Sequence, residues 1–446
     1  MSKTAFRLSM DQDLEQFRPE IEFACQFLER CHPVQRQHDA DRILHYGRTA
    51  PAGALHIPSA LFPAAVRIDE NGIHPNPSAM QEIETGINGM HLLPPYLAGT
   101  DGQAKHGRVA SLPYDALGLI FNLLSRLEER DSPAVERDRY LRFPMDASLS
   151  YRRASLDTPL ADLAARDIAA ALIGTSKPEI STTYNVWLTH DVDRLRGYHR
   201  RRETLRKSAG ELIYQRNPKA AARRLWRELS PGEPWRSCRH IMDLSERYGH
   251  TSRFYFMGPV DNHMDSPYVI DEPDVVKRLA DEMVSRGHVL GFHPGVYTHG
   301  NATEWRRQKE GIEAVLGHTL TEGRHHGMLF EAETTWDIWN DGGMQMDASL
   351  GYPERSGFRS GTCRAHATYS LRRRKTLDLL EVPSPILDFG FFGGRYRDIS
   401  VDDALAECQG IIDTCREHGG DLMILYHTSQ NWRPQTTFYE QLIERV

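Results

Sequence analysis

Apolar side chains recur every three or four residues in the first third of the chain. This spacing is clearest in Phe17–Arg30 and Tyr114–Arg130, and an Ala-rich stretch follows at Leu160–Leu172. Positions three and four apart share one face of a helix, so the pattern predicts amphipathic helices there. The sequence between the first two segments is rich in Pro and Gly, which indicates loops. These helices carry no cluster of reactive side chains, and we expect them to build a core.

A different rhythm begins near residue 185, where short apolar runs alternate with amphipathic segments. The predicted strands are Val186–Leu188, Arg253–Met257, Val289–Phe292, Leu379–Val382 and Leu422–Tyr426, and the predicted helices are Ser237–Tyr248, Glu272–Arg286, Thr303–Leu316 and Val401–His418. This alternation is typical of a parallel β/α domain. A stretch of mixed Pro, Ser and Asp at 144–184 places a boundary near residue 175. We therefore expect an N-terminal α/β accessory domain (1–175) and a C-terminal (β/α) barrel (176–446).

Composition narrows the function further. Lys and Arg number 54 against 61 Asp and Glu, a mildly acidic balance that does not favour nucleic acid as a partner. The chain starts without an apolar leader, and no run approaches the roughly 18 apolar residues that cross a bilayer. Its six cysteines are scattered, which favours reduced thiols over a disulfide framework or a cysteine zinc site. These features predict a cytoplasmic protein without a transmembrane segment.

Reactive side chains follow the predicted strands at their carboxyl ends. Asp191 and Asp193 end the first strand in the run THDVD, and alternation in an extended backbone places both carboxylates on one side. His293 and His427 end later strands. In β/α barrels the sites gather at this edge, so a metal can be held there by a carboxylate and imidazoles, with one position left open for water. Asp193 and His293 are the best two ligands.

The third ligand is open from spacing alone. A His-x-x-x-His motif starting at His293 would place it at residue 297, which is a tyrosine. The two candidates are His299 and His326, the latter in the run GRHHG. A divalent metal with such nitrogen and oxygen ligands is predicted to be zinc.

The motifs resemble those of NodB-homology polysaccharide deacetylases, the family 4 carbohydrate esterases, over about residues 185–446. The THDVD run is similar to the family's Asp-x-Asp opening. Gly291–Gly295 (GFHPG) is similar to the first half of the family's His-Ser/Thr-x-x-His motif, and Leu425–His427 (LYH) is similar to its last motif. A narrower resemblance is to bacterial members with an added N-terminal domain. It rests on Leu188–Asp193, Arg324–His326 (RHH) and Asp347–Gly351 (DASLG).

The resemblance implies a deformed (β/α) barrel of NodB type and a role for each residue. Asp191 would be the catalytic base, Asp193 and His293 metal ligands, and His427 the acid that protonates the leaving group. Arg324 would orient the base. In the narrower group Arg-x-His replaces the missing histidine, which favours His326 over His299. Asp347 and Glu381, at apparent strand ends, would support Arg324 or His427.

The implied function is a metal-dependent hydrolase that removes acetyl groups from an N- or O-acetylated glycan or glycan precursor. Two alternatives stay open: an inactive glycan-binding protein on the same scaffold, which the tyrosine at position 297 favours, and a glycosyltransferase that holds its metal through Asp-x-Asp. Basic runs at Arg194–Ser208 and Arg223–Arg227 are typical of a solvated face, with peripheral contact to an anionic membrane as the alternative reading.

Overall fold

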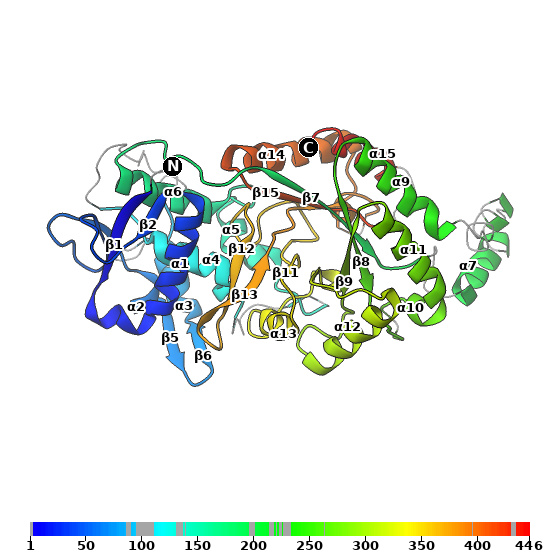
Figure 1. Ribbon diagram of the computed structural model, residues 1–446, viewed down its shortest axis with the longest axis horizontal. Coiled ribbons are helices and arrows are strands. Elements are labelled where there is room, and N and C mark those ends of the chain that lie inside the picture. Colours follow the sequence, from blue (N-terminus) through cyan, green and yellow to red (C-terminus); the bar gives the residue numbers. More distant parts are fainter. Residues whose placement is uncertain are drawn as a thin grey trace.

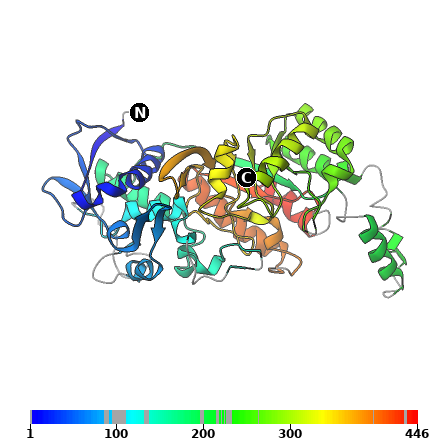
Figure 2. The ribbon, with the colours of Figure 1, turned by 90° about the horizontal axis from the view of Figure 1, so that it is seen from below.

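The computed structural model describes residues 3–85, 91–94, 111–130, 137–138, 140–195, 201–213, 218–219, 221–222, 225, 233–262, 264–394, 396–429 and 434–446. The chain is a mixed α/β protein with a small sheet near the N-terminus and a larger, curled sheet in the rest (Figure 1). Seen from below, the two parts lie end to end along the long axis (Figure 2).

The small sheet is wholly parallel and has the strand order β2-β1-β3-β4. Its strands are β1 (Thr4–Met10), β2 (Val34–Arg36), β3 (Ile43–Gly47) and β4 (Ala54–Pro58), and an antiparallel hairpin follows with β5 (Val66–Asp69) and β6 (Gly72–Pro75). The helices of this part are α1 (Arg18–Cys31), α2 (Leu61–Ala65), α3 (Pro77–Thr85), α4 (Ala116–Ser125), α5 (Leu149–Arg152) and α6 (Leu160–Ile173). The helices predicted at 17–30 and 160–172 are therefore present as α1 and α6.

The helix predicted over 114–130 is shorter in the structure. It ends at Ser125 because Arg126 adopts a left-handed backbone conformation (φ 58°), and a 3-10 turn, Leu127–Glu129, follows. The apolar spacing continues past the true end, so it could not reveal where the helix stops.

The large sheet has nine strands in the order β12-β13-β11-β10-β9-β8-β7-β15-β14. They are β7 (Asn185–Val192), β8 (Ser252–Met257), β9 (Val289–His293), β10 (Glu322–Gly323), β11 (Met346–Asp347), β12 (His366–Ser370), β13 (Lys375–Glu381), β14 (Ile386–Leu387) and β15 (Asp421–Leu425). All neighbouring pairs are parallel except β12 with β13. Within the described residues β12 and β14 remain the sheet's edges, so the expected barrel has the form of an open half-barrel.

Helices connect the strands of the large sheet. They are α7 (Arg201–Ile213), α9 (Glu233–Arg247), α10 (Tyr268–Asp271), α11 (Pro273–Ser285), α12 (Ala302–Leu316), α13 (Thr335–Asp341), α14 (Val401–His418) and α15 (Gln435–Ile443). The four predicted helices correspond to α9, α11, α12 and α14. The five predicted strands overlap β7, β8, β9, β13 and β15, whereas β10, β11, β12 and β14 were not anticipated.

The hydrophobic core continues from the small sheet into the large one. Phe23 of α1 and Phe121 of α4 pack on the Tyr369 ring of β12, with ring centroids 5.0 and 5.2 Å apart, and side chains from both parts belong to one buried cluster. The two-domain division at residue 175 stays a prediction, because one buried apolar cluster extends across that position.

Two further expectations concern the cell compartment and the membrane. All six cysteines are buried and none forms a disulfide. No helix among the described residues has the length and apolar character needed to cross a bilayer. The first basic run falls partly on α7, which projects at the end of the molecule opposite the small sheet (Figure 1). Other residues of that run and most of 223–227 lie outside the described residues, so membrane contact stays a prediction.

A buried ion-pair network ties the two parts together. Glu129 accepts hydrogen bonds from Arg126 Nε (2.9 Å) and from Arg359 Nε and Nη2 (2.9 and 2.7 Å). All three side chains are almost wholly buried. Burial opposes the Glu129 charge, but Arg359 and Arg126 outweigh it and lower the pKa of Glu129 to about 2. Glu129 is therefore ionised at every pH at which the protein is handled.

We expect Glu129→Gln to destabilise the fold by about 3–5 kcal/mol, because it leaves buried guanidinium groups without a full counter-charge. The free energy of unfolding, measured in denaturant at pH 7, checks this. Glu15→Gln is the matched control: Glu15 forms a half-exposed pair with Arg18, and its loss should cost about 0–1 kcal/mol. Equal effects of the two substitutions would contradict the role given to the network.

Candidate metal centre

The site lies where adjacent parallel strands end together. The strand β7 carries Asp191 near its end and Asp193 just beyond it, His293 is the last residue of β9, and His427 follows β15 by two residues. Since β9, β8, β7 and β15 are neighbours and all parallel, their carboxyl ends form one edge, and the side chains that follow converge there.

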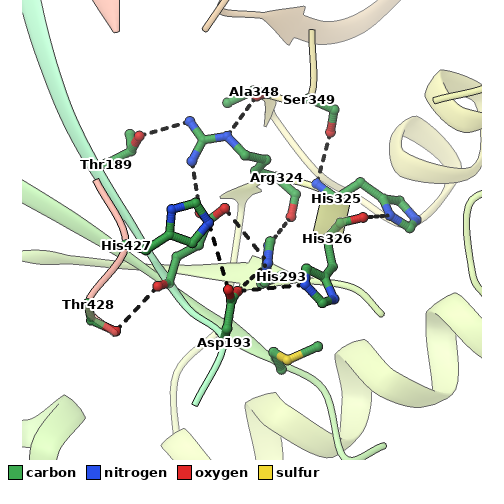
Figure 3. Close-up of polar contacts among 12 residues, drawn as sticks. Thr189, Asp193, His293, Arg324, His325, His326, Ala348, Ser349, His427 and Thr428 are labelled. Carbon is green, nitrogen blue, oxygen red and sulfur yellow. Dashed lines mark hydrogen bonds and ion pairs between the residues drawn. The ribbon is translucent and has the colours of Figure 1, made fainter. Parts of the chain in front are cut away.

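Three side chains form a cluster that suits a metal ion. Ligand atoms of Asp193, His293 and His326 lie within 4.8 Å of one another (Figure 3). Asp193 Oδ1 is 3.2 Å from His293 Nε2 and 3.9 Å from His326 Nε2. One carboxylate and two imidazoles form a donor set that leaves a coordination position open, as catalytic zinc sites require.

Hydrogen bonds on the far side of each ring orient the two imidazoles. His293 Nδ1 lies 2.6 Å from the backbone carbonyl of Arg324, so it carries the proton and leaves the Nε2 lone pair toward Asp193. Within the described residues neither His293 Nε2 nor Asp193 Oδ1 has a hydrogen-bond partner, although both atoms are buried. Two buried polar atoms 3.2 Å apart that lack a well-aligned hydrogen bond are the environment a cation would occupy.

Asp265, which no motif or spacing in the sequence indicated, holds the second imidazole. Its Oδ1 lies 2.5 Å from His326 Nδ1, and its carboxylate also accepts from the backbone N–H of Val296 and from Asn262. Burial opposes the His326 charge, but Asp193 and Asp265 outweigh burial and raise the pKa of His326. Burial also opposes the Asp265 charge, but the contact with His326 outweighs it, and the pKa of Asp265 is lowered. A carboxylate behind a ligating histidine fixes its tautomer and raises its basicity.

Arg324 and Asp191 form a buried ion pair beside the cluster. Arg324 Nη1 donates to Asp191 Oδ1 at 2.8 Å, Nη2 donates to Thr189 Oγ1 at 2.8 Å, and Nε donates to the carbonyl of Ala348 at 3.0 Å. The other carboxylate oxygen of Asp191 lies 3.7 Å from His293 Nε2. Asp191 is thus held with one oxygen on the guanidinium and the other toward the cluster.

His427 lies on the other side of Asp193. Its Nε2 is 3.7 Å from Asp193 Oδ2, while Nδ1 and the backbone N–H bind the carboxylate of Asp388 at 2.7 and 2.9 Å. Burial opposes a charged imidazole, but Asp388 and Asp193 outweigh it and raise the pKa of His427 to about 9. Sequence analysis missed Asp388, although it follows the apolar pair Ile386–Leu387 as the other site residues follow their strands.

His299, the alternative third ligand, makes its contacts outside the cluster. His299 Nδ1 bonds to the carbonyl of Val296 at 3.0 Å, and its Nε2 lies 3.4 Å from Glu331. Tyr297, at the position where the family motif has a histidine, is 53% exposed. The structure therefore brings His326, and not His299, to Asp193 and His293.

Asp347 and Glu381 were expected to support Arg324 or His427, and Asp347 interacts with Arg324 through its charge. Asp347 Oδ1 accepts from the N–H and Oγ of Ser349, and Glu381 accepts from the backbone N–H of Leu350 and from Trp336 Nε1. Among the described residues no hydrogen bond joins either acid to Arg324 or His427. The Ser349 Oγ in turn accepts from the backbone N–H of His325. The two acids therefore shape the loop that faces the site.

A pocket of about 350 Å³ opens over this group. Its walls include Asp191, Asp193, His326 and His427 together with Arg194, Ser429 and several apolar and aromatic side chains: Tyr140, Met264, Val296, Met328, Leu329, Phe389, Tyr396 and Leu425. Few polar groups converging in a largely apolar cavity of this size are typical of a small-molecule site.

Comparison with known proteins gives three results. A sequence family of unknown function, DUF7033, matches residues 15–176, which is well under half of the chain. No curated protein matches the sequence at a significant level.

Among solved structures, 17 chains match. One is a provisionally described polysaccharide deacetylase from Mycobacterium smegmatis. It is 14% identical in sequence, and the match covers 59% of this chain and 83% of that protein's chain (TM-score 0.40). The catalytic domain of a peptidoglycan N-acetylglucosamine deacetylase from Eubacterium rectale is 12% identical over 59% and 83% (TM-score 0.31). A CE4-family pseudoenzyme from Bacillus anthracis is 14% identical over 59% and 61% (TM-score 0.30). At such low identities and TM-scores these similarities do not decide the activity of this chain.

The cluster geometry predicts which histidine binds the metal. We expect His326→Ala to lose most of the zinc bound by the purified protein, because one of three ligand atoms is removed, whereas His299→Ala should keep it. Elemental analysis and competitive zinc titration measure this directly. Loss of zinc in His299→Ala with retention in His326→Ala would overturn the assignment.

Proposed function

We propose that this chain is a metal-dependent hydrolase that removes acetyl groups from an N- or O-acetylated carbohydrate. The observation that carries the proposal is one arrangement: the Asp193, His293 and His326 cluster lies between an Asp191–Arg324 pair and an Asp388–His427 pair, all along one pocket. A ligand cluster flanked by a carboxylate on one side and an imidazole on the other is what general acid–base hydrolysis at a metal requires.

The donor set favours zinc. Asp193, His293 and His326 would hold the ion through one oxygen and two nitrogens, a mixture that suits Zn²⁺ better than Mg²⁺ or Ca²⁺. When bound, such a cation acidifies a water molecule and polarises an acyl carbonyl. Hydrogen bonds to Arg324 and Asp265 already orient both imidazoles toward Asp193, so the site is preorganised for the ion.

Asp191 is the proposed base. Its Oδ1 is occupied by Arg324, so Oδ2, which faces the cluster, is the oxygen left to take a proton from the attacking water. The water oxygen then bonds to the acyl carbon. The guanidinium restricts the rotation of the Asp191 carboxylate, since Arg324 is itself anchored on Thr189 and Ala348.

His427 is the proposed acid. When the acyl carbon–nitrogen or carbon–oxygen bond breaks, the departing amine or alkoxide needs a proton, and His427 Nε2 faces the pocket across Asp193 from His293. Asp388 binds Nδ1 and keeps the ring fixed with Nε2 forward. Each turnover therefore moves one proton from water to Asp191 and one from His427 to the leaving group.

The geometry also weighs the alternatives. Glycosyltransferases that use Asp-x-Asp bind hard cations through oxygen ligands, and two imidazoles in the cluster disfavour that chemistry. The inactive-scaffold alternative rested on Tyr297, but His326 supplies the third ligand atom without it. That the substrate is a glycan precursor and that the protein is cytoplasmic both remain predictions.

Substitution of the base tests the proposal. We expect Asp191→Asn to keep its zinc and to lose about 10²–10⁴-fold in kcat for acetate release, since the amide cannot accept the proton. Asp193→Ala should lose both zinc and turnover. The measurements are zinc content and acetate released from a panel of N- and O-acetylated sugars and a small acetyl ester.

Asp243→Asn is the matched control, because Asp243 is an exposed carboxylate that pairs with Arg286 away from the pocket. It should change neither readout. Undiminished turnover in Asp191→Asn would remove the base assignment. Stoichiometric zinc in the unaltered protein with no acetate released from any substrate would favour a glycan-binding role over hydrolysis.

A further inference from the structure

A segment from the first third of the chain forms part of the pocket wall. Tyr140 and Arg142 precede the boundary expected near residue 175, yet they line the same cavity as Asp191 and His427. The half-barrel alone therefore does not enclose the pocket. The question is what a tyrosine and an arginine from this distant segment contribute there.

The segment has a defined shape imposed by Asp138. The Asp138 Oδ1 accepts from the backbone N–H groups of Tyr140 and Arg142, at 2.8 and 3.0 Å, and Oδ2 accepts from Arg142 Nε at 2.7 Å. Between them Leu141 is in the left-handed region (φ 66°), although its side chain is 61% exposed and packs on little. A strained backbone that surrounding hydrogen bonds maintain, and no core packing requires, is typical of a functional segment.

Arg142 joins two loops that carry proposed catalytic groups. Its Nη1 donates to the carbonyl of Gly327, next to His326, at 3.2 Å, and its Nη2 donates to the Tyr396 hydroxyl at 2.9 Å. The Arg142 side chain is buried, and its guanidinium carbon lies 5.1 Å from the Tyr140 ring centroid and 6.0 Å from that of Tyr396. The two rings thus flank one fixed cation.

The aromatic wall continues to the proposed acid. The Tyr396 ring lies 5.9 Å from Phe389, and Phe389 lies 5.1 Å from the His427 ring. A row of rings therefore runs from Tyr396 through Phe389 to His427, and the Arg142 guanidinium connects Tyr140 to its far end. Aromatic faces bind the apolar faces of sugar rings, and tyrosine hydroxyls provide polar contacts at their edges.

We propose that Tyr140, Arg142 and Tyr396 form a sugar-binding wall that positions a neutral N-acetylated oligosaccharide, with the acetylated residue at His427 and a neighbouring ring against Tyr140. The inference rests on the proposed function and adds the residues that select an oligosaccharide over an isolated acetyl group. Asp138 already neutralises the Arg142 guanidinium, so the wall itself presents no net charge, which suits a neutral sugar. Tyr140 and Tyr396 supply the contact surface, and Arg142 holds them in place.

The test compares a sugar chain with a substrate too small to reach the wall. We expect Tyr140→Ala to raise KM, and the Kd for binding, about tenfold for a tetramer of N-acetylglucosamine, and to lower kcat/KM for 4-nitrophenyl acetate by a much smaller factor, because that ester is too small to reach the wall. Tyr140→Phe, which keeps the ring, should restore most of the affinity. Tyr151→Ala, an exposed tyrosine of α5, is the matched control.

The outcomes separate this inference from the proposed function. Unchanged KM and Kd for the tetramer in Tyr140→Ala would overturn the wall, as would an equal loss on both substrates, which indicates general damage to the site. A wild-type protein that hydrolyses the ester but does not bind the tetramer would also overturn it and leave the hydrolase standing. If the wild type hydrolyses neither substrate but Tyr140→Ala binds the tetramer tenfold more weakly, the hydrolase fails and the wall is supported.

Discussion

A single buried guanidinium, that of Arg324, links the groups of the site. A charge with 0% exposure is tolerated only where its donors are satisfied, and Arg324 donates to Asp191, to Thr189 and Ser384, and to the carbonyl of Ala348. Its own backbone carbonyl accepts from His293 Nδ1. One residue therefore fixes the rotation of the proposed base and the tautomer of a proposed ligand, because its side chain and its main chain act on two strands at once.

Two histidines with a carboxylate behind them occupy different places in this site. Asp265 directs His326 Nε2 toward Asp193 Oδ1, and Asp388 directs His427 Nε2 toward Asp193 Oδ2. A metal ligand must give up its proton, whereas a general acid must keep one. In the proposed function Asp193 separates a ligand side from an acid side. The same carboxylate–histidine pair would serve on each side, with its role set by its position relative to Asp193.

Sequence reasoning located the groups that follow long strands and missed those that follow short ones or loops. Asp191, Asp193 and His293 follow apolar runs of three or four residues in longer strands, so periodicity placed them at one edge. The strands β10 and β14 have two residues each, too few for any period, and Asp265 lies in a loop. His326 was favoured only through a family resemblance. The end of α4 was missed because Arg126 pairs with Glu129, whose other partner, Arg359, is 230 residues away in sequence.

The first third of the chain contributes to the site as well as to the core. The half-barrel is open, and the N-terminal helices pack on its antiparallel edge strand through Tyr369. From the same part Arg142 reaches the carbonyl of Gly327, where the backbone is left-handed at Gly327 and at Met328 (φ 70° and 58°). A left-handed methionine carries strain that its neighbours must offset, and this carbonyl adjoins His326. A contact from the N-terminal part therefore helps to hold the loop that presents His326 to the cluster.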